Sequence, residues 1–127
     1  MKYLLDTHTA TWALGDKKRL SKKAIEIIDN TSLPIYVSIT SAWEIAIKVS
    51  VNKLTFQGGS EFFLSEMQKN GIRILGIEGA YIKQLETLPL IHRDPFDRLL
   101  IATAKVENMK LITADENIQK YDIEWEW

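Results

Sequence analysis

The stretch PFDRLLIATAKVENMKLIT, residues 95–113, decides the fold because it joins a helix directly to a strand. Its first part has apolar or small residues at helical spacing and a proline near the first helical position, which predicts a helix from Pro95. Residues 110–113 form a short stretch (KLIT) with two apolar residues and with the β-formers Ile and Thr, which predicts a strand. A helix followed at once by a strand is the repeating unit of α/β proteins.

The same alternation continues towards both ends of the chain. Strands are predicted at residues 3–5, 35–37 and 72–75, with another at 122–125 along the edge of the sheet. Further helices are predicted after a cap at Thr7 or Thr9, from Ser21 to near Asn30, over 42–48, from Ser60 to Asn70, over 80–85 and over 115–119. This order predicts a three-layer α/β sandwich whose central sheet is mainly parallel, has four or five strands and is flanked by helices.

Length and composition limit the classes of protein that the chain can belong to. With 127 residues, 46% of them hydrophobic, we expect one globular domain over residues 1–127. The absence of cysteine excludes disulfide scaffolds, thiolate zinc sites and cysteine nucleophiles. A net charge of −1 gives no overall attraction to nucleic acid or to membranes, so any such attraction must be local. No signal peptide or membrane span is evident, and we expect a cytoplasmic location.

Four acidic residues occupy positions where a parallel sheet places its ligands, beyond the carboxyl ends of the strands. Asp6 ends the first predicted strand, and Asp115 follows the strand at 110–113. Glu44 and Asp97 are expected in the first turns of their helices. Each acid alone could simply cap a helix. Together, four carboxylates would repel one another unless a cation neutralised them, and hard oxygen ligands suit Mg²⁺ or Mn²⁺ better than zinc or copper.

The motifs around these acids resemble those of PIN domains, and more narrowly those of the VapC-type toxins of toxin–antitoxin pairs. The matching stretches are Leu4-Leu5-Asp6-Thr7-His8, Ser41-Ala42-Trp43-Glu44-Ile45, residues 92–102 (HRDPFDRLLIA) and Thr113-Ala114-Asp115. The resemblance implies that Asp6, Glu44, Asp97 and Asp115 form an acidic, metal-binding catalytic quartet, with Thr113 as its accompanying hydroxyl residue. It also implies a metal-dependent ribonuclease that is inhibited by a cognate antitoxin protein and usually forms a homodimer. Thr7-His8 departs from many members of the family but leaves the quartet intact.

The chemistry that fits these residues is hydrolysis of RNA phosphodiester bonds assisted by one or two Mg²⁺ or Mn²⁺ ions. A receiver-like phosphoacceptor domain is an alternative, but it needs a pair of adjacent acids after the first strand. A haloacid-dehalogenase-type phosphatase needs a second Asp where His8 stands. A catalytically inactive PIN-like binding module is the third alternative, and the presence of all four acids argues against it.

Several neighbouring residues have both a functional and a structural interpretation. Asp94 is expected to cap the helix at Pro95, and otherwise to contribute to the site. His8 and His92 could contact phosphate or donate a proton, or could be structural. Residues that could bind RNA phosphates are Arg93, Arg98, Lys17, Lys18, Arg19, Lys22 and Lys23. Arg98 could instead pair with Asp97. The lysine-rich run, residues 17–23, could be a solvated face.

The aromatic residues are first expected in the core or in a groove for a partner. Trp12, Trp43, Phe62 and Phe63 lie at helical spacing among aliphatic residues. The helices predicted at 42–48 and from Ser60 to Asn70 have more apolar surface than one core contact needs. The residues that provide it are Trp43, Ile47, Phe62, Phe63 and Met67. We therefore expect an antitoxin helix or a second subunit to cover part of that surface, and an antitoxin Arg to enter the acidic groove.

Overall fold

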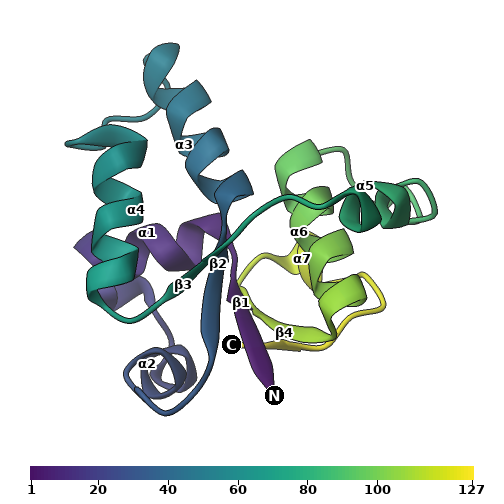
Figure 1. Cartoon of the computed structure of the whole chain (residues 1–127), viewed down its shortest axis with the longest axis horizontal. Helices are drawn as coiled ribbons and strands as arrows, with labels where there is room; N and C mark the ends of the chain where they lie inside the picture. Colours follow the sequence, from purple (N-terminus) through teal and green to yellow (C-terminus); the bar gives the residue numbers. More distant parts are fainter.

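The computed structural model describes residues 1–127 and contains one five-stranded sheet (Figure 1). The strands lie in the order β3-β2-β1-β4-β5, and every neighbouring pair is parallel. Their bounds are Lys2–Leu5 (β1), Ile35–Ser38 (β2), Arg73–Leu75 (β3), Met109–Ile112 (β4) and Trp125–Glu126 (β5). The α/β class and the parallel sheet predicted from the sequence are therefore confirmed. β5 is an edge strand as expected, but it starts three residues later than predicted.

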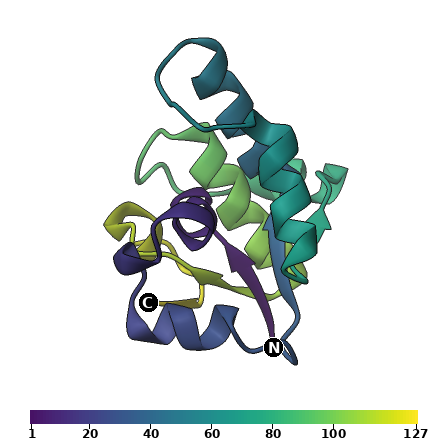
Figure 2. The ribbon, with the colours of Figure 1, turned by 90° about the vertical axis from the view of Figure 1, so that its left-hand side faces the viewer.

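Seven α-helices flank the sheet in two groups (Figures 1 and 2). One group contains α1 (Thr7–Gly15), α2 (Lys22–Ile28), α3 (Ile39–Ser50) and α4 (Gly59–Lys69), with a 3₁₀ turn at Lys17–Arg19 between α1 and α2. The other contains α5 (Gly79–Leu85), α6 (Pro95–Glu107) and α7 (Glu116–Gln119). None of these helices combines the length and apolar character needed to cross a membrane.

Two apolar cores lie on opposite faces of the sheet because side chains alternate along a strand. Leu5 of β1 belongs to the core formed with α1 to α4, where Ile45 and Phe63 are fully buried. Its neighbour Leu4 belongs to the other core, together with Leu100 of α6 and Ile118 of α7. Both faces of the central strands are covered, which produces the three layers and explains why these strands are nearly all apolar.

Polar side chains begin several helices directly at the carboxyl ends of the strands. Asp6 caps α1 by accepting a 2.8 Å hydrogen bond from the backbone N–H of Thr9, so the prediction of a threonine cap was wrong. Ser38 caps α3 by accepting from the Thr40 N–H, and α3 therefore begins at Ile39, three residues earlier than expected. As a result, Glu44 lies in the second turn of α3 and not in the first.

The start of α6 agrees with the prediction, whereas the start of α4 does not. Asp94 caps α6 as expected, since its Oδ1 accepts hydrogen bonds from the N–H groups of Phe96 and Asp97. In contrast, α4 begins at Gly59 without a side-chain cap at Ser60. Gly58 precedes it with φ 84°, a left-handed conformation that glycine adopts without steric cost.

The predicted partner surface on α4 needs correction. Phe63 and Met67 are fully buried in the core shared with α1 to α3, so they cannot contact a partner. They lie four residues apart and therefore share one side of α4, and this side packs into the core. Phe62 lies on another side and is 45% exposed. Trp43 and Ile47 of α3 are also exposed, so part of the expected apolar surface exists there.

Candidate functional site

A small cavity lies beside the carboxyl ends of β1 and β4, and we call it the acid cavity. Its volume is about 70 Å³ and none of its lining residues is hydrophobic. The lining residues are Asp6, Thr7, His8, Glu44, Lys48, Asp94, Asp97 and Asp115. All four acids of the predicted quartet are therefore brought together, from segments that are far apart in the sequence. The cavity therefore concentrates carboxylates whose mutual repulsion a cation would relieve.

Asp6 is the acid of this cavity whose two carboxylate oxygens both have hydrogen-bond partners. Its side chain is almost completely buried, and both carboxylate oxygens accept hydrogen bonds. Oδ1 accepts from the Thr9 N–H, and Oδ2 accepts from the Thr113 hydroxyl at 2.5 Å. Burial raises the pKa of Asp6, while these hydrogen bonds act in the opposite direction. A buried carboxylate held in one orientation is suited to a fixed role in cation binding.

Thr113, the predicted hydroxyl residue, connects two of the acids. It is fully buried, and its Oγ1 donates to Asp6 while it accepts a 3.0 Å hydrogen bond from the Asp115 N–H. Asp115 in turn caps α7, because its Oδ1 accepts from the Asn117 N–H at 2.8 Å. Thr113 therefore fixes both Asp6 and the turn that carries Asp115.

Asp97 shows most directly that the acids influence one another. Its pKa is raised to about 6, chiefly by burial and further by the charges of Asp94, Asp115 and Glu44. A hydrogen bond from His92 opposes this rise: His92 Nε2 lies 3.1 Å from Asp97 Oδ2. A cation in the cavity would favour the ionised form of this carboxylate.

His92 orients Asp97 through a chain of hydrogen bonds that the sequence did not reveal. Its other ring nitrogen, Nδ1, lies 2.9 Å from the hydroxyl of Tyr121. Arg98 Nη1 donates to the same hydroxyl and to the carbonyl of Pro89, and its Nη2 donates to the carbonyl of Leu88. Arg98 thus forms no ion pair with Asp97, and its guanidinium contacts protein groups. An RNA contact by Arg98 stays a prediction.

Glu44 and Lys48 form the one ion pair inside the acid cavity. Lys48 Nζ donates to Glu44 Oε2 at 2.6 Å, and this bond raises the pKa of Lys48. The other carboxylate oxygen, Glu44 Oε1, is buried and has no hydrogen-bond partner. A buried oxygen without a donor is costly, which makes it a natural ligand for an incoming cation. Lys48 was not among the residues predicted from the sequence, although its position four residues after Glu44 on a helix indicates such a pair.

The donor atoms of the cavity fit a hard divalent ion. They are carboxylate oxygens, one of them without a partner, and their charges raise the pKa of Asp97. In this conformation, however, no group of three Asp, Glu or His side chains is arranged to hold an ion. Lys48 supplies positive charge at Glu44 instead. Because both oxygens of Asp6 are held by hydrogen bonds, the side chains of Glu44 and Asp97 would have to rotate when an ion binds to all three acids.

The predicted phosphate-binding residues lie on the surface. Arg93, Lys18, Lys22 and Lys23 are exposed and make no ion pair. The exposed Lys17 lies 3.8 Å from Asp29, and Arg19 lies 3.6 Å from Asp16. Exposed pairs of this kind are weak, so they leave the lysine-rich run available for phosphates.

A second cavity adjoins the acid cavity, and we call it the side cavity. Its volume is about 200 Å³, and it is lined by Asp6, His8, Trp12, Ala114 and Asp115. Three of these residues also line the acid cavity. The His8 ring stacks on the Trp12 ring, with centroids 5.6 Å apart and planes 19° from parallel.

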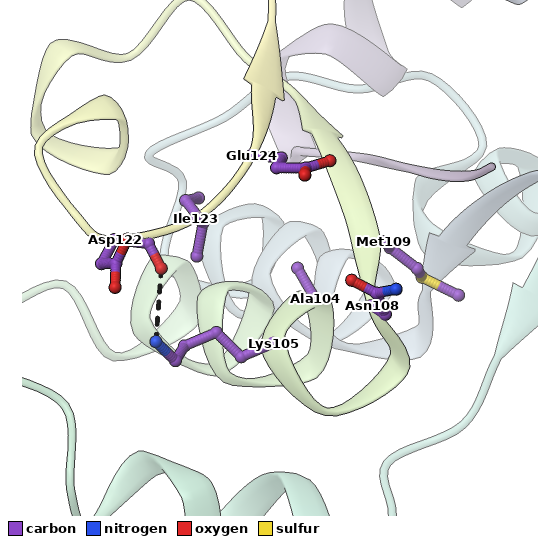
Figure 3. Close-up of a pocket in the computed structure, with 7 residues that line it drawn as sticks. All are labelled: Ala104, Lys105, Asn108, Met109, Asp122, Ile123 and Glu124. Atoms are coloured by element: carbon purple, nitrogen blue, oxygen red, sulfur yellow. Dashed lines mark hydrogen bonds between the residues drawn. The ribbon is translucent and has the colours of Figure 1, made fainter.

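A third cavity, the far cavity, lies at the opposite end of β4 (Figure 3). It is larger, at about 310 Å³, and is lined by Ala104, Lys105, Asn108, Met109, Asp122, Ile123 and Glu124. Its two acids are exposed, and Lys105 donates a 3.2 Å hydrogen bond to the backbone carbonyl of Asp122. No buried carboxylate lines this cavity, so its size does not mark it as a site for the predicted chemistry.

Comparison with known proteins gives the following matches. The family model for the PIN domain matches residues 3–124. Ribonuclease VapC22 from Mycobacterium tuberculosis is 27% identical over 119 residues, which cover 93% of this chain and 90% of that protein. The crystal structure of VapBC2 from Rickettsia felis bound to a promoter DNA fragment superposes with a TM-score of 0.76 at 18% identity, over 100% and 99% of the two chains. A toxin–antitoxin complex from Klebsiella pneumoniae superposes with a TM-score of 0.63 at 14% identity, over 98% of this chain and 96% of the other.

Proposed function

Because the chain belongs to the PIN domain family, we propose that it is a ribonuclease that hydrolyses phosphodiester bonds with a bound Mg²⁺ or Mn²⁺ ion. The observation that supports this most strongly is the acid cavity, where Asp6, Glu44, Asp97 and Asp115 converge without a hydrophobic neighbour. The similarity to a protein named as a ribonuclease supports the same activity.

Asp6, Glu44 and Asp97 would hold the ion, and Asp115 would complete or tune the site. When bound there, a divalent ion would supply a water molecule of lowered pKa and positive charge for the phosphate. The residues around the ligands fix their geometry. Thr113 and the Thr9 N–H hold Asp6, and His92 holds Asp97. Lys48 neutralises Glu44 in the absence of the ion and lines the same cavity, where it could approach a phosphate.

A cleavage assay with purified protein and labelled RNA tests the proposal. We expect cleavage with Mg²⁺ or Mn²⁺, no cleavage with EDTA, and recovery when the ion is restored. Asp97→Asn should remove the activity, whereas Asp122→Asn in the far cavity should keep it. If RNA stays intact with either ion under conditions in which the protein is folded, the inactive PIN-like binding module becomes the better reading.

We further propose that the protein is the toxin of a toxin–antitoxin pair and that a partner protein covers the exposed face of α3. Trp43 and Ile47 lie four residues apart on α3, and Val51 follows at the same spacing as the residue that caps its carboxyl end; they are 51%, 38% and 53% exposed. Such a stripe is typical of a surface that packs on another helix. The ion pair between Lys48 and Glu44 supports the proposal that an antitoxin Arg enters the cavity, because a cationic side chain already pairs with one of its acids.

The partner proposal is tested by co-expression with the protein encoded next to this one. Ile47→Glu should weaken copurification with that protein or the formation of a homodimer, measured by light scattering after gel filtration. Ile82→Glu is the matched control, since Ile82 is 52% exposed on α5. Equal loss with both variants, or no loss with Ile47→Glu, would contradict the placement of the partner on α3.

A further inference from the structure

We propose that the side cavity binds one nucleobase of a single-stranded RNA, placed against the aromatic pair of His8 and Trp12. This assignment rests on the proposed function and deepens it, because it names the part of the substrate that lies next to the cleaved bond. Trp12 was first interpreted as a core or partner residue, and it does pack against the core formed with α1 to α4, but it also lines the side cavity. It is partly exposed and lines a cavity that opens beside the acid cavity.

Position is the first argument for a base in the side cavity. The side cavity and the acid cavity share Asp6, His8 and Asp115, so a group in one lies directly beside a group in the other. In RNA, each phosphate links two riboses, and each ribose carries a base. A phosphate at the acid cavity therefore brings a base within reach of the side cavity. Its volume of about 200 Å³ is below the roughly 300 Å³ of a typical drug-sized pocket, which suits one planar ring system.

The aromatic lining is the second argument. His8 and Trp12 already form a nearly parallel stack, and the ring of Trp127 lies 6.0 Å from that of Trp12. His8 is exposed, Trp12 is partly exposed, and both line the side cavity. Every nucleobase has a π-face, and stacking on aromatic side chains binds single strands with little sequence preference. The far cavity has no aromatic residue in its lining.

Charge is the third argument, and it favours RNA over a protein segment as the occupant. The guanidinium of Arg19 lies 5.4 Å from the centre of the Trp12 ring, and Lys17 and Lys18 belong to the same 3₁₀ turn. This cationic turn begins two residues after α1 ends. A strand that leaves the side cavity along α1 would therefore pass exposed cations, which bind phosphates. The acid cavity, the aromatic pair and the cationic turn together offer contacts for the cleaved phosphate, for an adjoining base and for the flanking phosphates.

Equilibrium binding of a short single-stranded RNA tests this assignment. The probe is a labelled oligonucleotide, compared with the same oligonucleotide carrying abasic nucleotides, in buffer with Ca²⁺ and with RNA integrity checked on a gel. From the usual strength of base–aromatic stacking, Trp12→Leu should weaken binding of the intact probe by about ten- to a hundredfold. It should weaken binding of the abasic probe far less. Trp12→Phe should retain most of the affinity, which separates loss of stacking from misfolding.

The matched control is Trp125→Leu, because Trp125 is 41% exposed and lines neither the side cavity nor the acid cavity. Its affinity for the probe should equal that of the wild type. Arg19→Gln should weaken both probes about equally and reduce the salt dependence of binding, as expected for a phosphate contact. In the cleavage assay, Trp12→Leu should raise KM more than it lowers kcat, because the lost contact serves binding.

The outcomes separate this assignment from the proposed function. If the wild type cleaves RNA but folded Trp12→Leu and Trp12→Phe bind both probes like the wild type, the base site is wrong and the ribonuclease proposal stands. If Trp12→Leu keeps RNA affinity but loses a copurifying protein, the cavity serves a protein partner, which also overturns the assignment. If the wild type neither cleaves nor binds RNA, the proposed function itself fails.

Discussion

The acid cavity and the far cavity lie at opposite ends of the same strand, β4, and differ in nearly every chemical respect. The far cavity is about four times larger, at 310 Å³ against 70 Å³. Yet its carboxylates are exposed, whereas Asp6 and Glu44 of the acid cavity are 4% exposed. Volume is therefore a poor guide to function in this molecule. Buried carboxylates that share one space, and whose charges act on one another, are the informative feature.

Helix α6 contributes to both cavities and shows why they differ. Its first turn brings Asp97, with the cap Asp94, to the acid cavity, and its last turn brings Ala104 and Lys105 to the far cavity. Helices favour acids at the amino end and cations at the carboxyl end, since these charges complement the backbone dipole. In a parallel sheet, the helices that follow the strands all start at the side where the carboxyl ends of the strands lie. Acids at helix starts therefore lie near the carboxyl ends of the strands, and four acids of this sequence line one cavity there.

The largest expected effect comes from neutralising the acid cavity. Asp6→Asn should lower kcat/KM for RNA cleavage by at least about a hundredfold, because the cation loses a charged ligand and charge stabilisation dominates such reactions. Since burial raises the pKa of Asp6, the substitution should not destabilise the ion-free protein through charge. Cleavage assays and circular dichroism check both statements. Glu124→Gln in the far cavity is the control. Wild-type activity in a folded Asp6→Asn protein would remove the distinction between the cavities.

The next effect is on pH dependence and concerns Asp97. Its folded pKa, about 6, lies above its ordinary value of 3.8, so the folded state holds the proton more tightly than the unfolded chain does. This group therefore stabilises the ion-free protein below about pH 4, and the contribution is lost as the pH rises through about 6.

Ion binding should follow the opposite trend, because the ion requires the carboxylate form. The rise in unfolding temperature caused by Mn²⁺ should be small at about pH 5 and larger at about pH 7.5, on either side of the Asp97 pKa. Asp97→Asn should show a reduced rise at both values. An equal Mn²⁺ effect in wild type at the two pH values would count against a role for Asp97 in ion binding.

A moderate effect is expected from Thr113, which supports the acid cavity without lining it. Thr113→Val removes the donor to Asp6 Oδ2 and the acceptor for the Asp115 N–H. We expect about a tenfold loss of cleavage and about 1 kcal/mol lower free energy of unfolding, the usual size for such hydrogen bonds. Thr113→Ser keeps the hydroxyl and is the control. Equal activity of the Val and Ser variants would show that this hydrogen bond does not position Asp6.

The smallest effect belongs to the far cavity. Lys105→Ala removes one exposed hydrogen bond to the backbone of Asp122. Its free energy of unfolding should change by no more than about 0.5 kcal/mol, and cleavage should stay within about twofold of wild type. Chemical denaturation and the same cleavage assay measure these values. A large loss of activity in this variant would mean that the larger cavity takes part in function after all.

Much of this arrangement could be predicted from the sequence, because the informative signals are local. Alternating apolar runs and helical periodicity identified the parallel sheet, and Asp94 before Pro95 identified the start of α6. The start of α3 was misplaced because Ser38, at the last position of β2, also caps the helix. Because Ser38 is both the last residue of β2 and the cap of α3, no loop residues separate the two elements, and the sequence pattern does not mark the boundary.

The contacts that the sequence did not reveal join residues by tertiary packing. The hydrogen bonds of His92 to Asp97 and Tyr121 span a loop and the carboxyl-terminal segment, and no periodicity links them. The burial of Phe63 and the exposure of Phe62 depend on how α4 is rotated against the sheet. The His8–Trp12 pair has helical spacing, but only the folded chain places it beside the acids.

A crystal structure of the protein soaked with Mn²⁺ at about pH 7.5, where Asp97 is ionised, tests the central claim most directly. Anomalous scattering would locate the ion without reference to any activity. We expect a peak in the acid cavity, in contact with carboxylate oxygens of Asp6, Glu44 or Asp97, with Lys48 moved away from Glu44 Oε2. The far cavity should show no peak. An acid cavity without an anomalous peak at saturating Mn²⁺, with its carboxylates accessible in the crystal, would contradict a metal-dependent site there.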